Sequence, residues 1–345
     1  MRQTHSRPIL HWLAAAHSLL LITCGSQALD AGSDVGLLPV HAHNPVIVNN
    51  DNYDDNWQGV YAVLFANAGR PTLAGIIIND SVYAPDIDNS ITAWRALVTA
   101  GRASGMRNLP DPIVSQGRPL VRPSDGNIDS TVSNHSPGAQ LIVETSGRLG
   151  LPQRPLVVAT GGRLTDVADA YLVDHSVQDR VVVVSSLGSV SGNGGVMGAP
   201  NGEIDPWADW IVAQRFTYVQ VSAFYDQTTD VPSSQLDSLP KNAFGEFVAA
   251  QQPIIENIPT RDDHVAIIAV GEPEFVVSVQ RMALDPAGTF ETSVGPKLVP
   301  DANGHVWLVT AVDGAAATPT SVADAAGPQD LRRIGRTVMA GRRRS

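Results

Sequence analysis

Short apolar runs alternate with amphipathic segments along most of the chain. Five runs are rich in β-branched residues and are bounded by polar residues, glycine or proline: residues 45–50, 73–78, 111–117, 154–160 and 180–187. Between them, apolar residues recur at or near helical spacing, as in Trp57, Val60, Tyr61 and Leu64 and again in Ile91, Trp94, Leu97 and Val98. The alternation predicts an α/β fold that is Rossmann-like, with a mostly parallel central sheet and helices on both faces.

The C-terminal third of the chain changes this pattern. Residues 275–294 and 304–314 are typical of antiparallel strands, and a Pro-Ala-Gly turn lies within the first of the two segments. No internal repeat and no linker rich in proline, glycine or serine divides the chain. We therefore expect a single α/β domain over residues 45–314, with an antiparallel addition at its C-terminal end.

The two ends of the chain have the composition of segments outside this domain. Residues 1–28 combine two arginines, an apolar run over residues 9–23 and a small-residue site at 26–28, which is typical of a secretory signal peptide and predicts a secreted or periplasmic protein. Cys24, the only cysteine, lies in this segment, so we expect no disulfide in the mature chain. Lipid anchoring at Cys24 is the alternative, and Thr23 before it is atypical. Residues 315–345 predict an Arg-rich C-terminal tail.

The charge of the chain limits its partners. The formal net charge is -11, from 23 basic and 34 acidic side chains. This balance argues against a nucleic-acid or anionic-membrane surface as the main partner. Beyond the signal segment, no apolar run reaches the ~18 residues that a membrane helix needs. We therefore expect no membrane span and a small-molecule partner, and the sequence leaves the oligomeric state open, a homo-oligomer included.

Acidic and amide side chains gather where the predicted strands end or where helices begin. Four such clusters occur: Asp51, Asp54 and Asp55; Thr165 and Asp166; Glu203, Asp205 and Asp209; and Asp262, Asp263 and His264. The carboxyl ends of parallel strands meet at one edge of a sheet, so all four clusters could converge there. Crowded carboxylates repel one another and raise one another's pKa, which favours a shared cation.

Each cluster also has a purely structural interpretation. Asp54, Thr165 and Asp262 would serve as helix N-caps, which for any one of them alone is the commoner role. His135 and His264 are expected to be ordinary surface or loop residues. No Cys/His spacing indicates zinc, and oxygen ligands alone would select calcium or magnesium. The glycine-rich segment 191–198 lacks the lysine of a P-loop, and no G-x-S-x-G elbow indicates a serine hydrolase.

Five segments together resemble the inosine-uridine-preferring nucleoside hydrolases and their secreted relatives. The family's D-x-D-x-x-x-D-D signature resembles residues 49–56, and its P-V-Y-x-G-x-x-x-P-L segment resembles residues 112–120. Its G-P-L-T-N motif is similar to residues 161–166, its E-x-N-x-x-x-D-P segment to residues 203–210, and its late H-D to residues 262–266. The order and spacing of the five segments span most of the mature chain.

The resemblance implies a calcium site and a reaction. It implies that one Ca²⁺ is held by four groups: Asp51, Asp55, the backbone carbonyl of Thr165 and Asp263. It further implies that Asp51 accepts a proton from the metal-bound water, and that the ribose hydroxyls are held by Asp54, Glu203 and Asp205. The expected function is calcium-dependent hydrolysis of the N-glycosidic bond of a nucleoside or related riboside.

The chain departs from the family pattern at several positions. Asn49 stands where the signature has its first aspartate, and the spacing to Asp54 and Asp55 is one residue short. Asp205 stands where the family has asparagine, and Asp262 where many members have the histidine that assists the leaving base. These changes keep open a nucleoside-hydrolase-like protein that binds a sugar or nucleoside with little turnover. A general solute-binding protein is a third alternative, but two comparable lobes are not apparent in the sequence.

Overall fold

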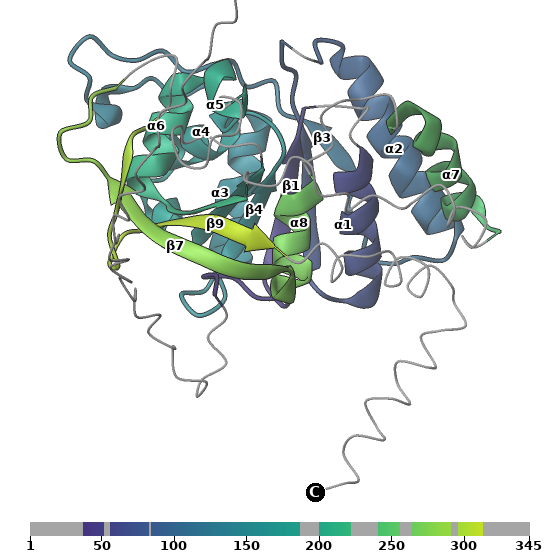
Figure 1. Cartoon of the computed structure of the whole chain (residues 1–345). Coiled ribbons are helices and arrows are strands. Elements are labelled where there is room, and N and C mark those ends of the chain that lie inside the picture. Colours follow the sequence, from purple (N-terminus) through teal and green to yellow (C-terminus); the bar gives the residue numbers. More distant parts are fainter. Residues whose placement is uncertain are drawn as a thin grey trace, which may run out of the picture. The chain divides into compact units, whose positions relative to one another are not determined.

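The computed structural model of the chain describes seven ranges of residues, shown with the whole chain in Figure 1: 37–51, 56–82, 84–186, 200–221, 241–255, 264–290 and 296–312. The predicted signal peptide, the C-terminal tail and the glycine-rich segment 191–198 lie outside these ranges. The described residues have the predicted α/β architecture, with strands and helices alternating from residue 45 to residue 221.

The strands of the described residues form one nine-stranded sheet. They are β1 (Pro45–Asn50), β2 (Thr72–Ile78), β3 (Pro112–Val114), β4 (Leu156–Thr160), β5 (Val181–Ser186), β6 (Thr217–Val221), β7 (Val276–Leu284), β8 (Leu298–Pro300) and β9 (Val306–Val312). Their order is β3-β2-β1-β4-β5-β6-β9-β7-β8, and every pairing from β3 to β9 is parallel. Strands β1, β4 and β5 are buried along their whole length, as strands covered on both faces are.

Helices connect the parallel strands. They are α1 (Asn56–Ala68), α2 (Ile87–Ala103), α3 (Pro137–Leu149), α4 (Thr165–Val173), α5 (Pro200–Ile204), α6 (Pro206–Arg215), α7 (Ala243–Ile255) and α8 (His264–Gly271). Short 3-10 helices cover Ile128–Ser130, His175–Asp179 and Pro273–Phe275. The helical spacing seen in the sequence around Trp57 and Trp94 forms α1 and α2, and both tryptophans are buried.

The sheet has a separate apolar core on each face. Val46 and Val48 of β1 pack with α1, α2, α7 and α8, whereas Ile47 points to the opposite core, where α3, α4 and α6 pack (Figure 1). This alternation follows from the two-residue period of a strand. Helices therefore cover both faces, and the strand ends are left at the edges of the layers, where the polar residues lie.

The C-terminal addition is antiparallel through β7. This strand pairs antiparallel with both β8 and β9, which confirms the predicted addition. Strand β9 itself runs parallel to β6, so this part of the predicted segment 304–314 extends the parallel sheet. Among the helices that the structure describes, none combines the length and the apolar character that crossing a membrane requires.

Candidate active site

The candidate site lies at the carboxyl edge of the sheet, where the strand order reverses. The first six strands run in the order 3-2-1-4-5-6, so the connections change direction between β1 and β4. In open α/β sheets, ligands bind beside this switch point. Asp51 directly follows β1, and the turn 161–164 directly follows β4. The backbone amide of Gly161 donates to the carbonyl of Asn49 at 2.9 Å, which holds the turn beside the end of β1.

Asp51 is buried against this turn. A Cβ atom at Gly162 would lie 3.1 Å from the Cβ and Cγ atoms of Asp51, a tight contact, so a larger residue there would require Asp51 to shift by a few tenths of an ångström. Burial raises the pKa of Asp51 to about 6, although a hydrogen bond from Ser81 and the charge of Arg163 act in the opposite direction. A carboxyl group with this pKa is suited to accept a proton near neutral pH.

Asp166, the first-turn acid of α4, collects four side-chain donors. Its Oδ2 accepts from the amides of Asn49 at 3.2 Å and Asn79 at 3.3 Å. Its Oδ1 accepts from the hydroxyl groups of Ser115, in a very short contact, and Ser136 at 2.9 Å. These donors come from the ends of β1, β2 and β3 and from the residue that caps α3. The buried carboxylate therefore joins three strand ends to two helices.

The pair of Asn49 and Asp166 explains one departure from the family pattern. Asn49 replaces the first aspartate of the signature, and Asp166 stands where the G-P-L-T-N motif ends in asparagine. The structure places the two side chains in contact, with the amide donating to the carboxylate. Relative to the family pattern, the carboxylate and the amide have thus changed places, and in this chain the amide at position 49 donates to the carboxylate at position 166.

Asp205 links the starts of α4 and α6. As the N-cap of α6, it accepts the backbone amide of Ala208 on Oδ1 at 3.1 Å. Its Oδ2 accepts the amide of Leu120 at 2.9 Å and the hydroxyl group of Thr165 at 2.6 Å. Burial raises the pKa of Asp205, and these hydrogen bonds oppose the rise. Thr165 is the first residue of α4 rather than its N-cap, which is Leu164.

These contacts show how far the predicted clusters meet. Asp51 lies beside the turn that leads to Thr165, and Thr165 contacts Asp205, so the clusters after β1 and β4 and before α6 converge as predicted. The predicted residues Asp54, Asp55 and Asp263 lie outside the described residues. Glu203 lies in α5, where only its backbone is described. The roles predicted for all of these residues stay predictions.

His264 corrects an expectation from the sequence. It was expected at the surface or in a loop, but it begins α8 and is only 2% exposed. Its ring stacks on Tyr61 with the centroids 5.8 Å apart, and burial lowers its pKa to about 3. The four residues that follow His264 in the sequence are apolar and buried, and His264 is buried with them at the start of the helix. The two aspartates before His264 made a surface position look more plausible from the sequence.

Arg163 is a buried cation that sequence reasoning missed. It is 4% exposed, and its Nη2 donates to Oδ1 of Asp80 at 2.8 Å and to the carbonyl of Gly117 in a very short contact. The guanidinium lines a pocket of ≈ 420 Å³ beyond the ends of β2 and β3. The pocket is lined by Asp80, Ile87, Asp88, Val114, Gln116, Gly117, Arg118, Pro119 and Arg163. The sequence signal that could have found Arg163 is that it stands at the position where the G-P-L-T-N motif has proline.

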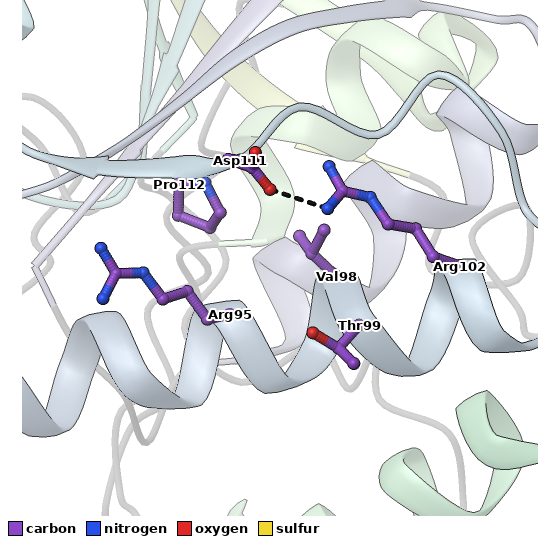
Figure 2. A pocket seen from close by; sticks show the side chains of 6 residues that line it. All are labelled: Arg95, Val98, Thr99, Arg102, Asp111 and Pro112. Atoms are coloured by element: carbon purple, nitrogen blue, oxygen red, sulfur yellow. Dashed lines mark hydrogen bonds and ion pairs between the residues drawn. The ribbon is translucent and has the colours of Figure 1, made fainter.

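A second pocket, of ≈ 410 Å³, lies at the amino end of β3 (Figure 2). Its lining comes from α2 and from the start of β3. Figure 2 shows the ion pair between Arg102 and Asp111, whose atoms are 2.7 Å apart and whose side chains are 46% and 80% exposed. An ion pair this exposed contributes little to the stability of the fold. Of the predicted site residues that the structure describes, none lines this pocket, so substitutions in it serve as controls.

The described residues contain part of the predicted calcium site. They include Asp51 and Thr165, and within the described ranges no group of three or more His, Cys, Asp or Glu side chains is placed to hold a metal ion. Asp51 fits a hard cation, because burial raises the pKa of its carboxyl group and a bound cation would offset that cost of desolvation. The donor set of the described part is thus compatible with calcium.

Comparison with solved structures identifies the fold. The chain is similar to an inosine-uridine-preferring nucleoside hydrolase from Bacillus anthracis, with a TM-score of 0.56 and 16% identity over 81% of this chain and 99% of that one. It is also similar to an inosine-guanosine nucleoside hydrolase, with a TM-score of 0.58 and 16% identity over 82% and 99% of the two chains. A purine-preferring ribonucleoside hydrolase from Gardnerella vaginalis gives a TM-score of 0.56 with 16% identity over 81% and 99%. No family model and no curated protein sequence matches. The chain therefore has a nucleoside-hydrolase-like fold.

Proposed function

We propose that this protein hydrolyses the N-glycosidic bond of a nucleoside or related riboside in a calcium-dependent reaction. The observation that carries the proposal is the position of Asp51, buried at the switch point of a nucleoside-hydrolase-like sheet and with a pKa raised to about 6. A carboxyl group there can both bind a cation and accept a proton.

In this proposal the site residues divide into two groups. Calcium would be held by Asp51, Asp55, the carbonyl of Thr165 and Asp263, and the ribose hydroxyls by Asp54, Glu203 and Asp205. When bound, the ion would supply positive charge that lowers the pKa of a water and grips the sugar diol.

Asp51 accepts the proton of the attacking water, and nearby carboxylates stabilise the oxocarbenium-like sugar. Asp205 keeps Thr165 in place by the 2.6 Å hydrogen bond, so it also positions the start of α4.

The test is product release from a nucleoside panel that includes nitrophenyl riboside. Purified protein with calcium should release free base and ribose from at least one member, and Asp51→Asn should lower the rate by about 10² or more, as loss of a general base does. Asp111→Asn is the matched control, because it removes one exposed carboxylate at the opposite edge of the sheet (Figure 2). Ribose binding without cleavage of any member, the activated riboside included, would establish a binding protein instead.

A further inference from the structure

Gln116 has a backbone conformation that is unfavourable for any residue except glycine. Its φ is 60°, in the left-handed region that residues with a side chain rarely adopt. Counted from Pro112, position 116 is where the P-V-Y-x-G-x-x-x-P-L segment has its glycine, which takes this conformation without strain. The chain thus keeps a strained glutamine where glycine would be unstrained, and strain of this kind is a reason to look for a function of the side chain.

Hydrogen bonds on both sides of Gln116 fix this conformation. The hydroxyl group of Ser115 donates to Asp166 in a very short contact and accepts the backbone amide of Gly117 at 3.1 Å. The carbonyl of Gly117 accepts from Arg163 in a second very short contact. Asp166 and Arg163 are both buried. Two buried charged groups therefore hold the backbone around Gln116, and the fold sets the direction in which its side chain leaves the loop.

The side chain of Gln116 is available to a ligand. Gln116 is exposed and lines the pocket of ≈ 420 Å³ beyond the ends of β2 and β3, and no described residue forms a hydrogen bond with its carboxamide. The pocket volume lies in the range of small-molecule sites. The lining includes two branched apolar side chains, two acids and two arginines: Ile87, Val114, Asp80, Asp88, Arg118 and Arg163. Balanced charge and an apolar wall suit an uncharged ligand, to which the carboxamide offers both a donor and an acceptor.

Two segments connect this pocket to Asp51. Asp80 lines the pocket, and Ser81, the next residue, forms a side-chain hydrogen bond with Asp51. Arg163 also lines the pocket, and Gly162, the residue before it, packs closely against Asp51. Along each segment, the pocket is one residue away from a contact with Asp51. A ribose held at Asp51 would therefore have the pocket within reach of the aglycone on its C1′.

We propose that Gln116 is a specificity-determining residue that binds the aglycone in this pocket through a donor and an adjacent acceptor on its ring. An N–H beside a C=O, as in hypoxanthine or uracil, provides such a pair. The inference rests on the proposed function and adds the class of aglycone to it. Glutamine suits this task, because its amide and its carbonyl can pair with two neighbouring ring atoms at once.

The test replaces Gln116 by the glycine of the family segment. Gln116→Gly should raise KM for inosine and uridine by about tenfold to a hundredfold, as loss of one or two hydrogen bonds does. It should leave kcat within about threefold, because a contact with an unreacting edge binds substrate and transition state equally. KM for nitrophenyl riboside, whose aglycone has no N–H, should change less than about threefold. The melting midpoint should not fall by more than about 2 °C, since glycine relieves the left-handed backbone.

Asn108→Gly is the matched control. Asn108 is also exposed and has a φ of 59°, but it lies in the loop before β3 and does not line the pocket. The substitution therefore removes a left-handed side chain without touching the proposed contact. It should change neither KM nor kcat for any riboside.

Each outcome decides the proposal. An unchanged KM for inosine and uridine, a fall in kcat alone, or an equal loss on nitrophenyl riboside overturns the role of Gln116 while the hydrolase function stands. If the wild type cleaves no riboside, the proposed function fails, and calorimetric titration of free hypoxanthine and uracil tests the pocket alone. Binding to the wild type that Gln116→Gly weakens at least tenfold supports the role of Gln116. No binding to the wild type, or equal binding to both proteins, overturns it.

Discussion

Replacing Asn49 by aspartate would place two carboxyl groups side by side in the core of the site. The amide of Asn49 donates to Oδ2 of Asp166 at 3.2 Å, and neither side chain has measurable exposure. Asn49→Asp removes this donor and introduces a second acid at the same place. The other three donors to Asp166 remain, so the effect reports the contact between positions 49 and 166.

The magnitude follows from the distance and the burial. Two charges 3.2 Å apart repel by about 5 kcal/mol at an effective dielectric constant of 20. Adjacent buried carboxyl groups escape most of this repulsion by sharing one proton, so the full value is an upper bound. Loss of a hydrogen bond to a charged group lowers the free energy of unfolding by about 1.5–3 kcal/mol. We expect Asn49→Asp to lower the free energy of unfolding by about 2–4 kcal/mol.

A second substitution should relieve the first. In Asn49→Asp/Asp166→Asn, the new amide at 166 can donate to the carboxylate at 49, and its oxygen can accept the hydroxyl groups of Ser115 and Ser136. Asn79 already donates to Oδ1 of Asn49 at 2.9 Å and can donate to an aspartate there as well. The free energy of unfolding of the double variant should therefore lie within about 1 kcal/mol of the wild-type value. This corresponds to a coupling free energy between positions 49 and 166 of about 2 kcal/mol or more.

Urea unfolding at pH 7.5 measures all four proteins of the cycle, provided that the m-values agree. Asn127→Asp is the control, because Asn127 is exposed and acts as the acceptor that caps a 3-10 helix, a role that aspartate also fills. It should change stability by less than about 0.5 kcal/mol. The reasoning is refuted if Asn49→Asp is as mild as this control, or if Asp166→Asn adds to its loss instead of reversing it.

Three further changes test other contacts of the site. Gly138→Ala should lower stability by about 1–3 kcal/mol in thermal unfolding, because its Cβ would lie 2.6 Å from the carboxylate of Asp166; Gly147→Ala in the same helix meets no atom within 4 Å and should be neutral or gain up to about 1 kcal/mol. Asp205→Ala should lose about 2–4 kcal/mol with its cap and two further hydrogen bonds, and an unchanged melting curve would contradict this. Calcium added after chelation should stabilise the protein by about 2.7 kcal/mol at a hundredfold excess over Kd, and this gain should be absent from Asp51→Ala.

The sequence predicted the layers of the fold because each layer has a local signature. The runs that form β1, β4 and β5 are continuously apolar, as strands buried on both faces are. The apolar residues of α2 recur with the helical period, which places Trp94 and Leu97 on one buried face. The direction of β9 could not be predicted in this way, because its apolar pattern is the same whether the strand runs parallel or antiparallel to its neighbour.

The site was predictable only where one segment carries the signal. Asp51 follows a strand directly, and its position at the edge follows from the sheet. The cluster around Asp166 depends instead on residues up to 117 positions away, and in the sequence Asn79 and Ser115 are ordinary polar residues at strand ends. Only the tertiary convergence of three strand ends shows that they share one carboxylate.

The same burial that makes Asp51 useful should make it destabilising when no calcium is present. The pKa of Asp51 rises from 3.8 in the unfolded chain to about 6 in the folded one, so the folded protein binds a proton more tightly. Stability from this group is therefore greatest below pH 3.8, and it falls as the pH rises from 3.8 through about 6. A shift of about two pKa units corresponds to a loss of about 3 kcal/mol at pH 7.5, as an upper bound.

Asp51→Asn should remove this penalty. In chelator, the variant should be more stable than the wild type at pH 7.5, by up to about 3 kcal/mol, and the two proteins should converge near pH 4. With calcium the order should reverse, because the ion offsets the buried charge in the wild type and has lost a ligand in the variant. Urea unfolding at several pH values, with chelator and with calcium, measures both effects. If the variant is less stable than the wild type in chelator at pH 7.5, Asp51 is held by protein contacts alone, and its burial gives no reason to place a cation beside it.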